Sequence, residues 1–427
     1  MRILLLGANG FIGRELGAAL QARGHAVVPG VRRASQAPAF STQAPMEIDL
    51  ARDCDAETWL PRLEGIDAVV NCAGILQARR GDRAEAIHVR APAALYAACL
   101  RSNARRVVLV SAISATPSAG TAYARTKLAG EDALRSTALE WVVLRPSLVH
   151  ARGAYGGTAL LRGLAALPGF IPVPGEGAQA FQPIGMDDLA QVVVKAVESD
   201  ALVRRTLEPV GPDVVTLRAI VVDYRRWLGL GPAIVVPIPG AFARVAARIG
   251  DLAGGTLNST AWAQLEHGNT GDAAAYARQS GLSPLGWRAA LARHPAHAQD
   301  RWHARLYFVR PLLRIALALL WIASGLVGAA AVATWSGPVA QALGVSGGSG
   351  AALLGFSCLL DIVLGTLVLA RWKPAVLAAL QAAVVIGYTA VAGIVQPALW
   401  LDPFGPLLKN LPVLAAIAAL AAIEEDR

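Results

Sequence analysis

Short apolar runs alternate with Ala-rich stretches of helical character over the first 150 or so residues. The apolar runs are residues 3–7, 25–31, 66–74, 105–112 and 140–147. Runs of four or five consecutive apolar residues are typical of parallel strands that are covered on both faces. Strands that alternate with helices predict an α/β domain with a doubly wound parallel sheet.

Residues 151–300 hold more Gly and Pro and show weaker periodicity. We interpret them as the last strands and helices of the α/β domain plus a small substrate lobe. The composition changes near residue 300, where residues 294–314 form a basic, aromatic segment. The pattern therefore predicts two domains, residues 1–300 and residues 301–427.

Four long apolar stretches follow, near residues 312–334, 351–370, 375–396 and 405–423. Each is close to the roughly 20 residues that a bilayer-spanning helix needs. Because the stretches have almost no polar face, they predict an all-α four-helix transmembrane bundle and not amphipathic packing in a soluble core.

Basic residues are distributed unevenly around these stretches. They precede the first and follow the second, at Arg301, Arg305, Arg310, Arg314, Arg371 and Lys373. The two other connections hold a single charged residue, Asp402. The positive-inside rule then predicts a multi-pass protein of the cell inner membrane, with the N-terminal domain and the C-terminus in the cytoplasm.

The composition agrees with a membrane protein, because 55% of the residues are hydrophobic and 16% are charged. The formal net charge is +9, but the Arg residues are scattered and form no basic block, which argues against nucleic-acid binding. The four Cys are far apart, without metal-ligand spacing, so we expect a reducing compartment and no metal.

Three glycines stand between the first predicted strand and the first predicted helix. Gly7 permits a tight turn, Gly10 lets the backbone approach a pyrophosphate, and Gly13 lets helix and strand pack closely. The free N–H groups of the helix N-terminus suit the phosphates. This loop, with Asn9, Phe11 and Ile12, is the predicted dinucleotide site.

The second strand ends in Arg32 and Arg33, where an NAD-preferring site usually has an acidic residue. A guanidinium pairs well with a 2′-phosphate, so NADP(H) is favoured over NAD(H). Asp49 follows the expected third strand and either bonds the adenine amine or caps a turn. We expect Ala73 and Gly74 to lie beneath the adenine ribose.

Tyr123 stands four residues before Lys127, but residues at this spacing are neighbours on any helix face. The surrounding segments decide the interpretation. "GANGFIG", "NCAG", "YARTK" and "LRPS" occur in this order, and "FQPIGMDDLAQVV" follows at 181–193. Residues 1–290 thereby resemble the extended and atypical short-chain dehydrogenase/reductases. They are most similar to the epimerase/dehydratase-like branch containing the nucleotide-binding accessory subunit of respiratory complex I.

The resemblance implies that Tyr123 moves a proton to or from a substrate oxygen. Lys127 and the positive nicotinamide would together bring the pKa of that tyrosine nearer to neutral, and Lys127 would also bond the nicotinamide ribose. Pro146 and Ser147 would lie near the nicotinamide carboxamide, whereas Arg145 is expected to be structural.

A third catalytic member, a serine after the fifth strand, is missing from its usual place in these enzymes. That place holds Ala112 and Ile113. Ser111 and Ser114 flank it and are the candidates to substitute. We expect Ser111 to point into the strand end and Ser114 to cap a turn unless the loop shifts.

Residues 312–423 resemble the DoxX-like membrane family, on the stretch "WLDPFGPLLKNLPVLAAIAAL" at 400–420. Asp361 lies within the second span, where an ionisable group needs a partner, and Lys409 and Asn410 are candidates. Asp361, Tyr388 and Gln381 form either a proton or quinone-headgroup site or packing contacts. His88 and His303 are interpreted as having no special role.

Two functions are consistent with this pattern. The first is a membrane-anchored NADP(H)-binding oxidoreductase or epimerase-type enzyme that acts on a lipid-soluble alcohol, ketone or quinone-like substrate, in contact with membrane lipid and a membrane redox partner. The second, favoured by Ala112 and Ile113, is a non-catalytic NADP(H)-binding scaffold or redox sensor. A nucleotide-gated transporter is a weaker alternative.

Overall fold

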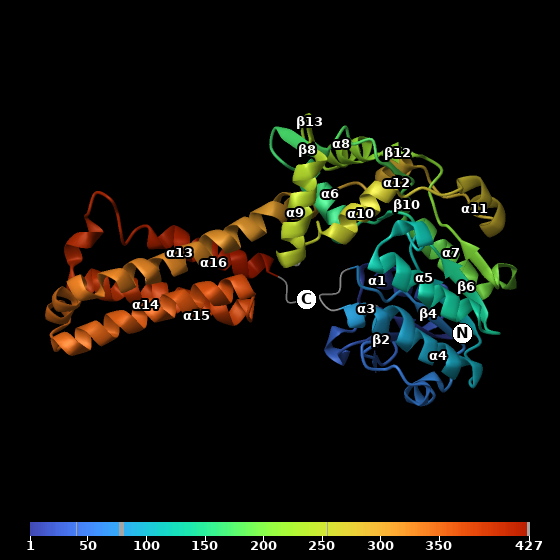
Figure 1. The fold of residues 1–427 in the computed structure, drawn as a ribbon, viewed down its shortest axis with the longest axis horizontal. Helices are drawn as coiled ribbons and strands as arrows, with labels where there is room; N and C mark the ends of the chain where they lie inside the picture. The colour runs from blue at the N-terminus through green and yellow to red at the C-terminus, as the bar shows by residue number, and fades with distance from the viewer. Residues whose placement is uncertain (40, 77–80, 254, 425–427) are drawn as a thin grey trace. The chain divides into compact units, whose positions relative to one another are not determined.

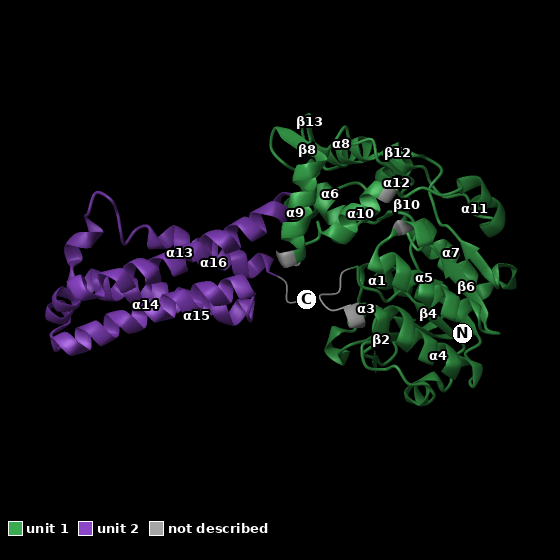
Figure 2. Cartoon of the chain, viewed as in Figure 1, with its two compact units in different colours: residues 1–304 green, residues 305–427 purple. Residues whose placement is uncertain are grey.

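The structure is a computed structural model that describes residues 1–427 except 40, 77–80, 254 and 425–427. It contains two compact units, Met1–Ala304 and Arg305–Arg427 (Figure 2). Helix α13 (Ala298–Leu343) begins in the first unit and continues into the second.

Unit 1 contains a seven-stranded parallel sheet in the order β11-β6-β5-β4-β1-β2-β3. Its strands are β1 (Arg2–Leu6), β2 (Ala26–Val31), β3 (Met46–Glu47), β4 (Ala68–Asn71), β5 (Arg106–Val110), β6 (Glu140–Leu144) and β11 (Arg205–Leu207). The predicted Rossmann-type sheet is confirmed, and all five apolar runs contain strands. The strands are shorter than the runs because the runs extend into the loops that follow.

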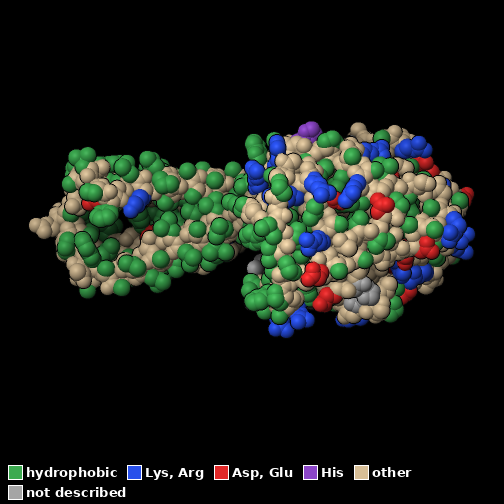
Figure 3. Space-filling model, turned by 90° about the horizontal axis from the view of Figure 1, so that it is seen from above, with side chains coloured by type: hydrophobic (Ala, Val, Ile, Leu, Met, Phe, Trp, Pro, Cys, Tyr) green, Lys and Arg blue, Asp and Glu red, His purple; other side chains and the backbone are tan. Residues whose placement is uncertain are grey.

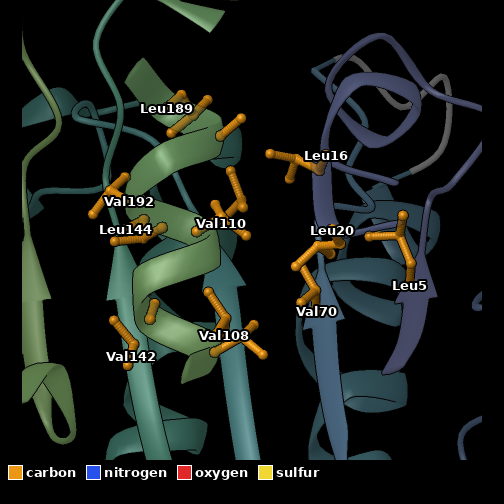
Figure 4. Packing of buried hydrophobic residues seen from close by; sticks show 14 of the residues in the cluster. Leu5, Leu16, Leu20, Val70, Val108, Val110, Val142, Leu144, Leu189 and Val192 are labelled. Carbon is orange, nitrogen blue, oxygen red and sulfur yellow. The ribbon is translucent and has the colours of Figure 1, made fainter. Parts of the chain in front are cut away.

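Helices cover both faces of this sheet (Figure 1). They are α1 (Phe11–Ala22), α2 (Ala56–Trp59), α3 (Gly81–Glu85), α4 (Ala91–Leu100), α5 (Ala122–Arg135) and α7 (Met186–Glu198). Ile3 and Leu5 pack on the side of α1 and α7, whereas Leu4 and Leu6 pack on the side of α2, α4 and α5. Figure 4 shows the first of these cores, between the strands, α1 and α7. Burial on both faces explains why the strands are apolar throughout.

The remainder of unit 1 is a smaller lobe of three two-stranded sheets, β7 with β10, β9 with β12, and β8 with β13. Its strands are β7 (Val149–His150), β8 (Phe170–Pro174), β9 (Ala180–Phe181), β10 (Ile184–Gly185), β12 (Val215–Thr216) and β13 (Ile234–Ile238). Its helices are α6 (Gly156–Ala165), α8 (Leu217–Trp227), α9 (Gly240–Ala253), α10 (Ser259–His267), α11 (Ala273–Ser280) and α12 (Trp287–Arg293).

Unit 2 consists of α13, α14 (Gly347–Ala370), α15 (Pro374–Val395) and α16 (Asn410–Ile423). Close packing of α13 and α14 depends on small residues, because a Cβ on Gly325 or Gly365 would overlap the backbone of the opposite helix. Figure 3 shows hydrophobic side chains over the surface of unit 2, whereas charged side chains are spread over unit 1.

Among the described residues, three helices, α13, α14 and α15, are long and apolar enough to cross a membrane. The predicted fourth span at 405–423 is shorter than expected, because the helix begins only at Asn410. The residues just before α16 form turns and not helix, because Gly405 has a left-handed φ of 55° and Pro406 has no N–H to donate. A 14-residue helix is about 21 Å long, short of a hydrocarbon core of about 30 Å.

Polar contacts inside unit 2 differ from the predicted ones. The Tyr388 hydroxyl donates to Asp361 Oδ1 at 3.1 Å. Asn410 instead donates to Thr389 Oγ1 at 2.7 Å, so Asp361 is not partnered by Asn410 as predicted. Gln381 is buried and accepts from the Trp321 indole at 2.8 Å.

Candidate active site

The glycine loop after β1 has the shape of an anion-binding helix N-terminus. Gly7 adopts a left-handed φ of 76°, and a Cβ on Gly13 would overlap its carbonyl oxygen. Gly10 caps α1 without a side-chain hydrogen bond, and the first turn contains no acidic residue. The free N–H groups and the positive dipole end of α1 therefore suit a pyrophosphate.

The other predicted loop residues have local partners. The carbonyl of Asn9 accepts from Arg14 Nε at 3.1 Å, and Ile12 packs against the core. The ring of Phe11 stacks on Tyr155, with ring centroids 6.2 Å apart. The loop is thus fixed by its own backbone and by an aromatic contact from the segment before α6.

The loop lies where the strand order reverses, because β1 pairs with both β2 and β4. Ligands of doubly wound sheets bind at this switch point. Gly7 is close to the residues that follow β4, since a Cβ on Gly7 would come within 3.0 Å of the Ala73 N and Cα atoms. Ala73 N–H donates to Asn71 Oδ1 at 3.1 Å.

Tyr123 and Lys127 lie in the first turns of α5, whose N-cap is the side chain of Thr121. Lys127 is buried, and its Nζ donates to the carbonyl of Val110 at 3.1 Å, at the end of β5. A Cβ on Gly74 would come within 3.1 Å of the same Nζ. The lysine therefore connects α5 with the carboxyl ends of β4 and β5.

The pKa values of this pair are shifted by burial. Burial lowers the pKa of Lys127 to about 8, against the favourable charges of Cys72 and Glu131. Burial raises the pKa of Tyr123 to about 12. Burial of Tyr123 thus acts against the lowering of its pKa that the Lys127 ammonium and a bound nicotinamide would cause, and that lowering stays a prediction.

The sequence interpretation missed His88, which is buried beside Tyr123 with ring centroids 5.7 Å apart. Its Nε2 accepts from the Ile75 N–H at 3.1 Å, so the other nitrogen, Nδ1, donates to Thr126 Oγ1 at 2.8 Å. Thr126 in turn donates to the Tyr123 carbonyl at 3.1 Å. Burial and the charge of Lys127 lower the pKa of His88 to about 3, so the ring is neutral. No sequence motif marks this residue.

The two candidate serines have different surroundings. Ser111 donates to Glu131 Oε1 at 2.5 Å. Glu131 is fully buried and also pairs with Arg145 and Arg135, at 2.6 and 3.0 Å. Ser111 and Arg145 are therefore occupied in a buried charge cluster, and the prediction that Ser111 substitutes for the missing serine is not supported by this geometry.

Ser114 is buried, and its Oγ accepts from Gln264 Nε2 of α10 at 3.3 Å. Its hydroxyl thus contacts the smaller lobe, whereas that of Ser111 bonds Glu131 of α5. Ile113, at the usual serine position, is buried in the core and donates its N–H to the Pro146 carbonyl at 3.0 Å. Ser114 is the better placed of the two candidates.

Ser147 is buried and donates its hydroxyl to the carbonyl of Gln182. Its backbone N–H donates to the Pro209 carbonyl at 3.1 Å. Pro146 and Ser147 therefore join β6 to the smaller lobe. The Ser147 hydroxyl is therefore already bonded within the protein, and the proximity of Pro146 and Ser147 to the nicotinamide carboxamide stays a prediction.

The predicted adenine end of the site consists of the residues that follow β2 and β3. Arg32 and Arg33 are exposed after β2, and neither forms an ion pair with a residue that the structure describes. Asp49 accepts from Ala51 N–H at 3.1 Å and lies 3.6 Å from Arg52, as a turn aspartate does. Within the described part of the chain, no group of three or more His, Cys, Asp or Glu could hold a metal ion.

The fold and this site define a dinucleotide-binding protein, and comparisons with known proteins agree. Residues 7–200 match the NAD(P)H-binding family, and residues 318–418 match the DoxX-like family. A 3-diazoavenalumate denitrifying reductase of Streptomyces is 30% identical over 56% of this chain and 84% of its own length. The chain belongs to the NAD(P)H-binding, epimerase-like short-chain dehydrogenase/reductases and carries a C-terminal DoxX-like domain.

Other relatives share the same region. A ceramide reductase of Caulobacter vibrioides is 28% identical over 56% of this chain and 74% of its own length. The mitochondrial NADH dehydrogenase [ubiquinone] 1 alpha subcomplex subunit 9 of Arabidopsis thaliana is 28% identical over 57% of this chain and 62% of its own length.

Two solved structures show the same fold at lower identity. One is a UDP-N-acetylglucosamine 4-epimerase from Bacillus cereus, with a TM-score of 0.53 at 16% identity over 69% of this chain and 95% of that one. The other is a short-chain dehydrogenase/reductase superfamily protein from Agrobacterium tumefaciens, with a TM-score of 0.53 at 17% identity over 73% and 99%.

Proposed function

We propose that this protein is a membrane-anchored, NADP(H)-dependent reductase of a lipid-soluble ketone, alcohol or quinone-like substrate. The observation that carries the proposal is the position of Lys127, one helical turn from Tyr123 and directly beside Gly74 and the end of β5. A surface pair at the same spacing would have neither the burial nor the contact with the cofactor strands.

The residues present fit a bound dinucleotide. The N-terminus of α1, which has no side-chain cap, would hold the pyrophosphate, and Lys127 would bond the nicotinamide ribose. The bound nicotinamide supplies the hydride, and the protein has to supply the proton. The close approach of Gly13 to Gly7 leaves the loop backbone exposed to the phosphates without a side chain between them.

Tyr123 is suited to donate that proton. Its raised pKa keeps the phenol protonated at neutral pH, and an alkoxide formed on the substrate is more basic than a phenolate. The charge of Lys127 would stabilise the phenolate that remains. Ser114 would hold the substrate oxygen in place of the missing serine, because its hydroxyl is directed to the smaller lobe.

The preference for NADP(H) rests on Arg32 and Arg33, whose exposed guanidinium groups have no competing ion pair with a described residue. A 2′-phosphate at the end of β2 would receive charge-assisted hydrogen bonds from them. Glu47 of β3 accepts from the Ala34 N–H at 2.8 Å, directly after these arginines, and has no ion pair with either of them among the described residues.

A lipid-soluble substrate is supported by three membrane-length apolar helices in the same chain and by the relative named as a ceramide reductase. Unit 2 also supports the proposed cytoplasmic location of both ends. Arg314 of α13 pairs with Glu424 after α16, and Arg371 after α14 lies 3.9 Å from the same carboxylate. The basic flanks therefore meet at one end of the bundle, as the positive-inside rule requires.

A second function, an NADP(H)-binding scaffold or redox sensor in a membrane assembly, is favoured by Ala112 and Ile113 and by the occupation of Ser111. The relative named as an NADH dehydrogenase subunit is consistent with it.

One experiment separates the two functions. The full chain is purified in mild detergent, its bound nucleotide is identified, and lipid-soluble carbonyls and quinones are screened for NADPH oxidation. Turnover of one of them supports the reductase. Tight nucleotide binding without turnover of any compound supports the scaffold.

A further inference from the structure

Helix α9 exposes an apolar stripe to solvent. Phe242, Val245 and Ile249 are 68%, 54% and 61% exposed. With about 3.6 residues per turn, these three side chains lie within about 60° of one another on the helix surface. Exposed apolar side chains that share one face mark an interaction surface more often than scattered ones do.

The same helix carries a basic strip beside this stripe. Arg244 and Arg248 are exposed, and the helical repeat places them between the apolar stripe and the buried face, with Arg248 about 60° from Val245. The buried face consists of Ala243 and Ala247, which pack on Trp262 of α10. Helix α9 therefore has a narrow inner face, an exposed apolar stripe and a cationic edge, the arrangement of helices that lie in a membrane interface.

Helix α10 connects this surface to the active site. It packs against α9 through Trp262, and its Gln264 Nε2 donates to Ser114 Oγ at 3.3 Å. The Trp262 indole N–H is buried and has no hydrogen-bond partner among the described residues. The core between the two helices has three buried residues, which is small for a helical pair. Segments with few buried apolar contacts open at a lower free-energy cost than the core of a domain.

We propose that α9 docks on an anionic lipid bilayer and that the α9–α10 pair admits the lipid-soluble substrate from the bilayer to Ser114. The lipid-substrate part of this proposal rests on the proposed function. The occupant is a bilayer and not a protein partner, because the chain also carries three membrane-length helices. The two arginines complement anionic headgroups beside a stripe that complements acyl chains.

The test uses the full chain reconstituted into phosphatidylcholine vesicles with and without phosphatidylglycerol. Cys54 and Cys72, the two cysteines that are not buried, are replaced by Ala. A nitroxide is attached to a single cysteine introduced at Phe242, Val245 or Ile249, and in the control at Ala201, which is exposed in the short segment before β11 and not on α9. Binding of NADPH to each labelled protein verifies folding, and relaxation by oxygen and by a water-soluble nickel chelate reports immersion.

We expect the oxygen-to-nickel accessibility ratio at the three stripe positions to be severalfold higher than at Ala201, and to rise further with phosphatidylglycerol. Equal ratios at all four positions would overturn the docking proposal. Spin–spin broadening at Val245 without a raised ratio would also overturn it, by showing a second copy of the chain on the stripe. The measurement needs no turnover, so a non-catalytic protein could still pass it and an active enzyme could still fail it.

Discussion

The ammonium group of Lys127 lies so close to Gly74 that a methyl group on this glycine would come within 3.1 Å of Nζ. Lys127 belongs to α5 and Gly74 follows β4, so the helix and the strand of the candidate site meet at one nitrogen atom. Val110 accepts a hydrogen bond from the same nitrogen. A change in the charge of Lys127 should therefore change the affinity for the nucleotide as well as the rate of turnover.

The pH dependence of nucleotide binding tests this connection. Lys127 is charged below its lowered pKa of about 8 and neutral above it. If the ammonium bonds the cofactor, affinity is full below that pH and falls as the pH rises through it. Losing a charge-assisted hydrogen bond costs about 1.5–3 kcal/mol, or about tenfold or more in affinity. Calorimetry should detect this fall in the wild type but not in Lys127→Met.

Lys195→Met is the matched control, because the Lys195 ammonium also donates to a backbone carbonyl, that of Ser280, at 2.7 Å. It should retain the wild-type pH profile. A Lys127→Met protein that keeps the same fall in affinity would show that another group titrates.

Gly13→Ala should prevent cofactor binding. The new Cβ would overlap the Gly7 carbonyl oxygen, so the loop would have to move away from the position that exposes its N–H groups. We expect NADPH affinity to fall at least about tenfold, which corresponds to about 1.4 kcal/mol. Gly157→Ala is the control, since a Cβ there meets no atom within 4 Å. Equal affinities for the two variants would argue against the glycine-loop site.

Replacing both Arg32 and Arg33 by Ala should remove the preference for NADPH. The two guanidinium groups are the exposed cations at the end of β2, and loss of their phosphate contacts should weaken NADPH binding about tenfold or more. NADH binding should change little. Arg105→Ala removes a charge from an exposed position on another loop and should leave both affinities unchanged. Indistinguishable wild-type affinities for NADPH and NADH would refute this assignment.

Ser111→Ala and Ser114→Ala should have different effects. Ser111 supports the buried Glu131, so its loss should reduce the free energy of unfolding by about 1–3 kcal/mol with a smaller effect on turnover. Ser114 lies toward the smaller lobe, so its loss should reduce turnover and leave NADPH affinity unchanged. Thermal melting and kinetics of both variants would check this, and the reverse outcome would restore Ser111 as the substitute serine.

The sequence predicted the features that repeat or that use distinctive residue types. Apolar runs predicted the strands because both faces of the sheet are buried, and the spaced glycines predicted the tight approach of Gly13 to Gly7. It did not predict His88, whose role depends on Thr126 and Ile75 coming together in space. The effect of burial on the pKa of Tyr123 could not be predicted either, because it depends on how the chain packs around the phenol and not on the spacing of Tyr123 and Lys127. Helix α16 is short because Gly405 and Pro406 precede it, and the hydropathy pattern does not reveal this break.

The most direct test of the account is the turnover of Tyr123→Phe in the reconstituted full chain, once NADPH oxidation by a lipid-soluble carbonyl has been observed. The variant loses only the phenolic oxygen, so NADPH affinity should be unchanged. Turnover should fall by about 10²–10⁴-fold, the contribution of a positioned acid–base group. Tyr96 is buried in the core on the sheet face opposite α1 and α7, so Tyr96→Phe should turn over at the wild-type rate. A wild-type rate for Tyr123→Phe would contradict the proposed proton donor.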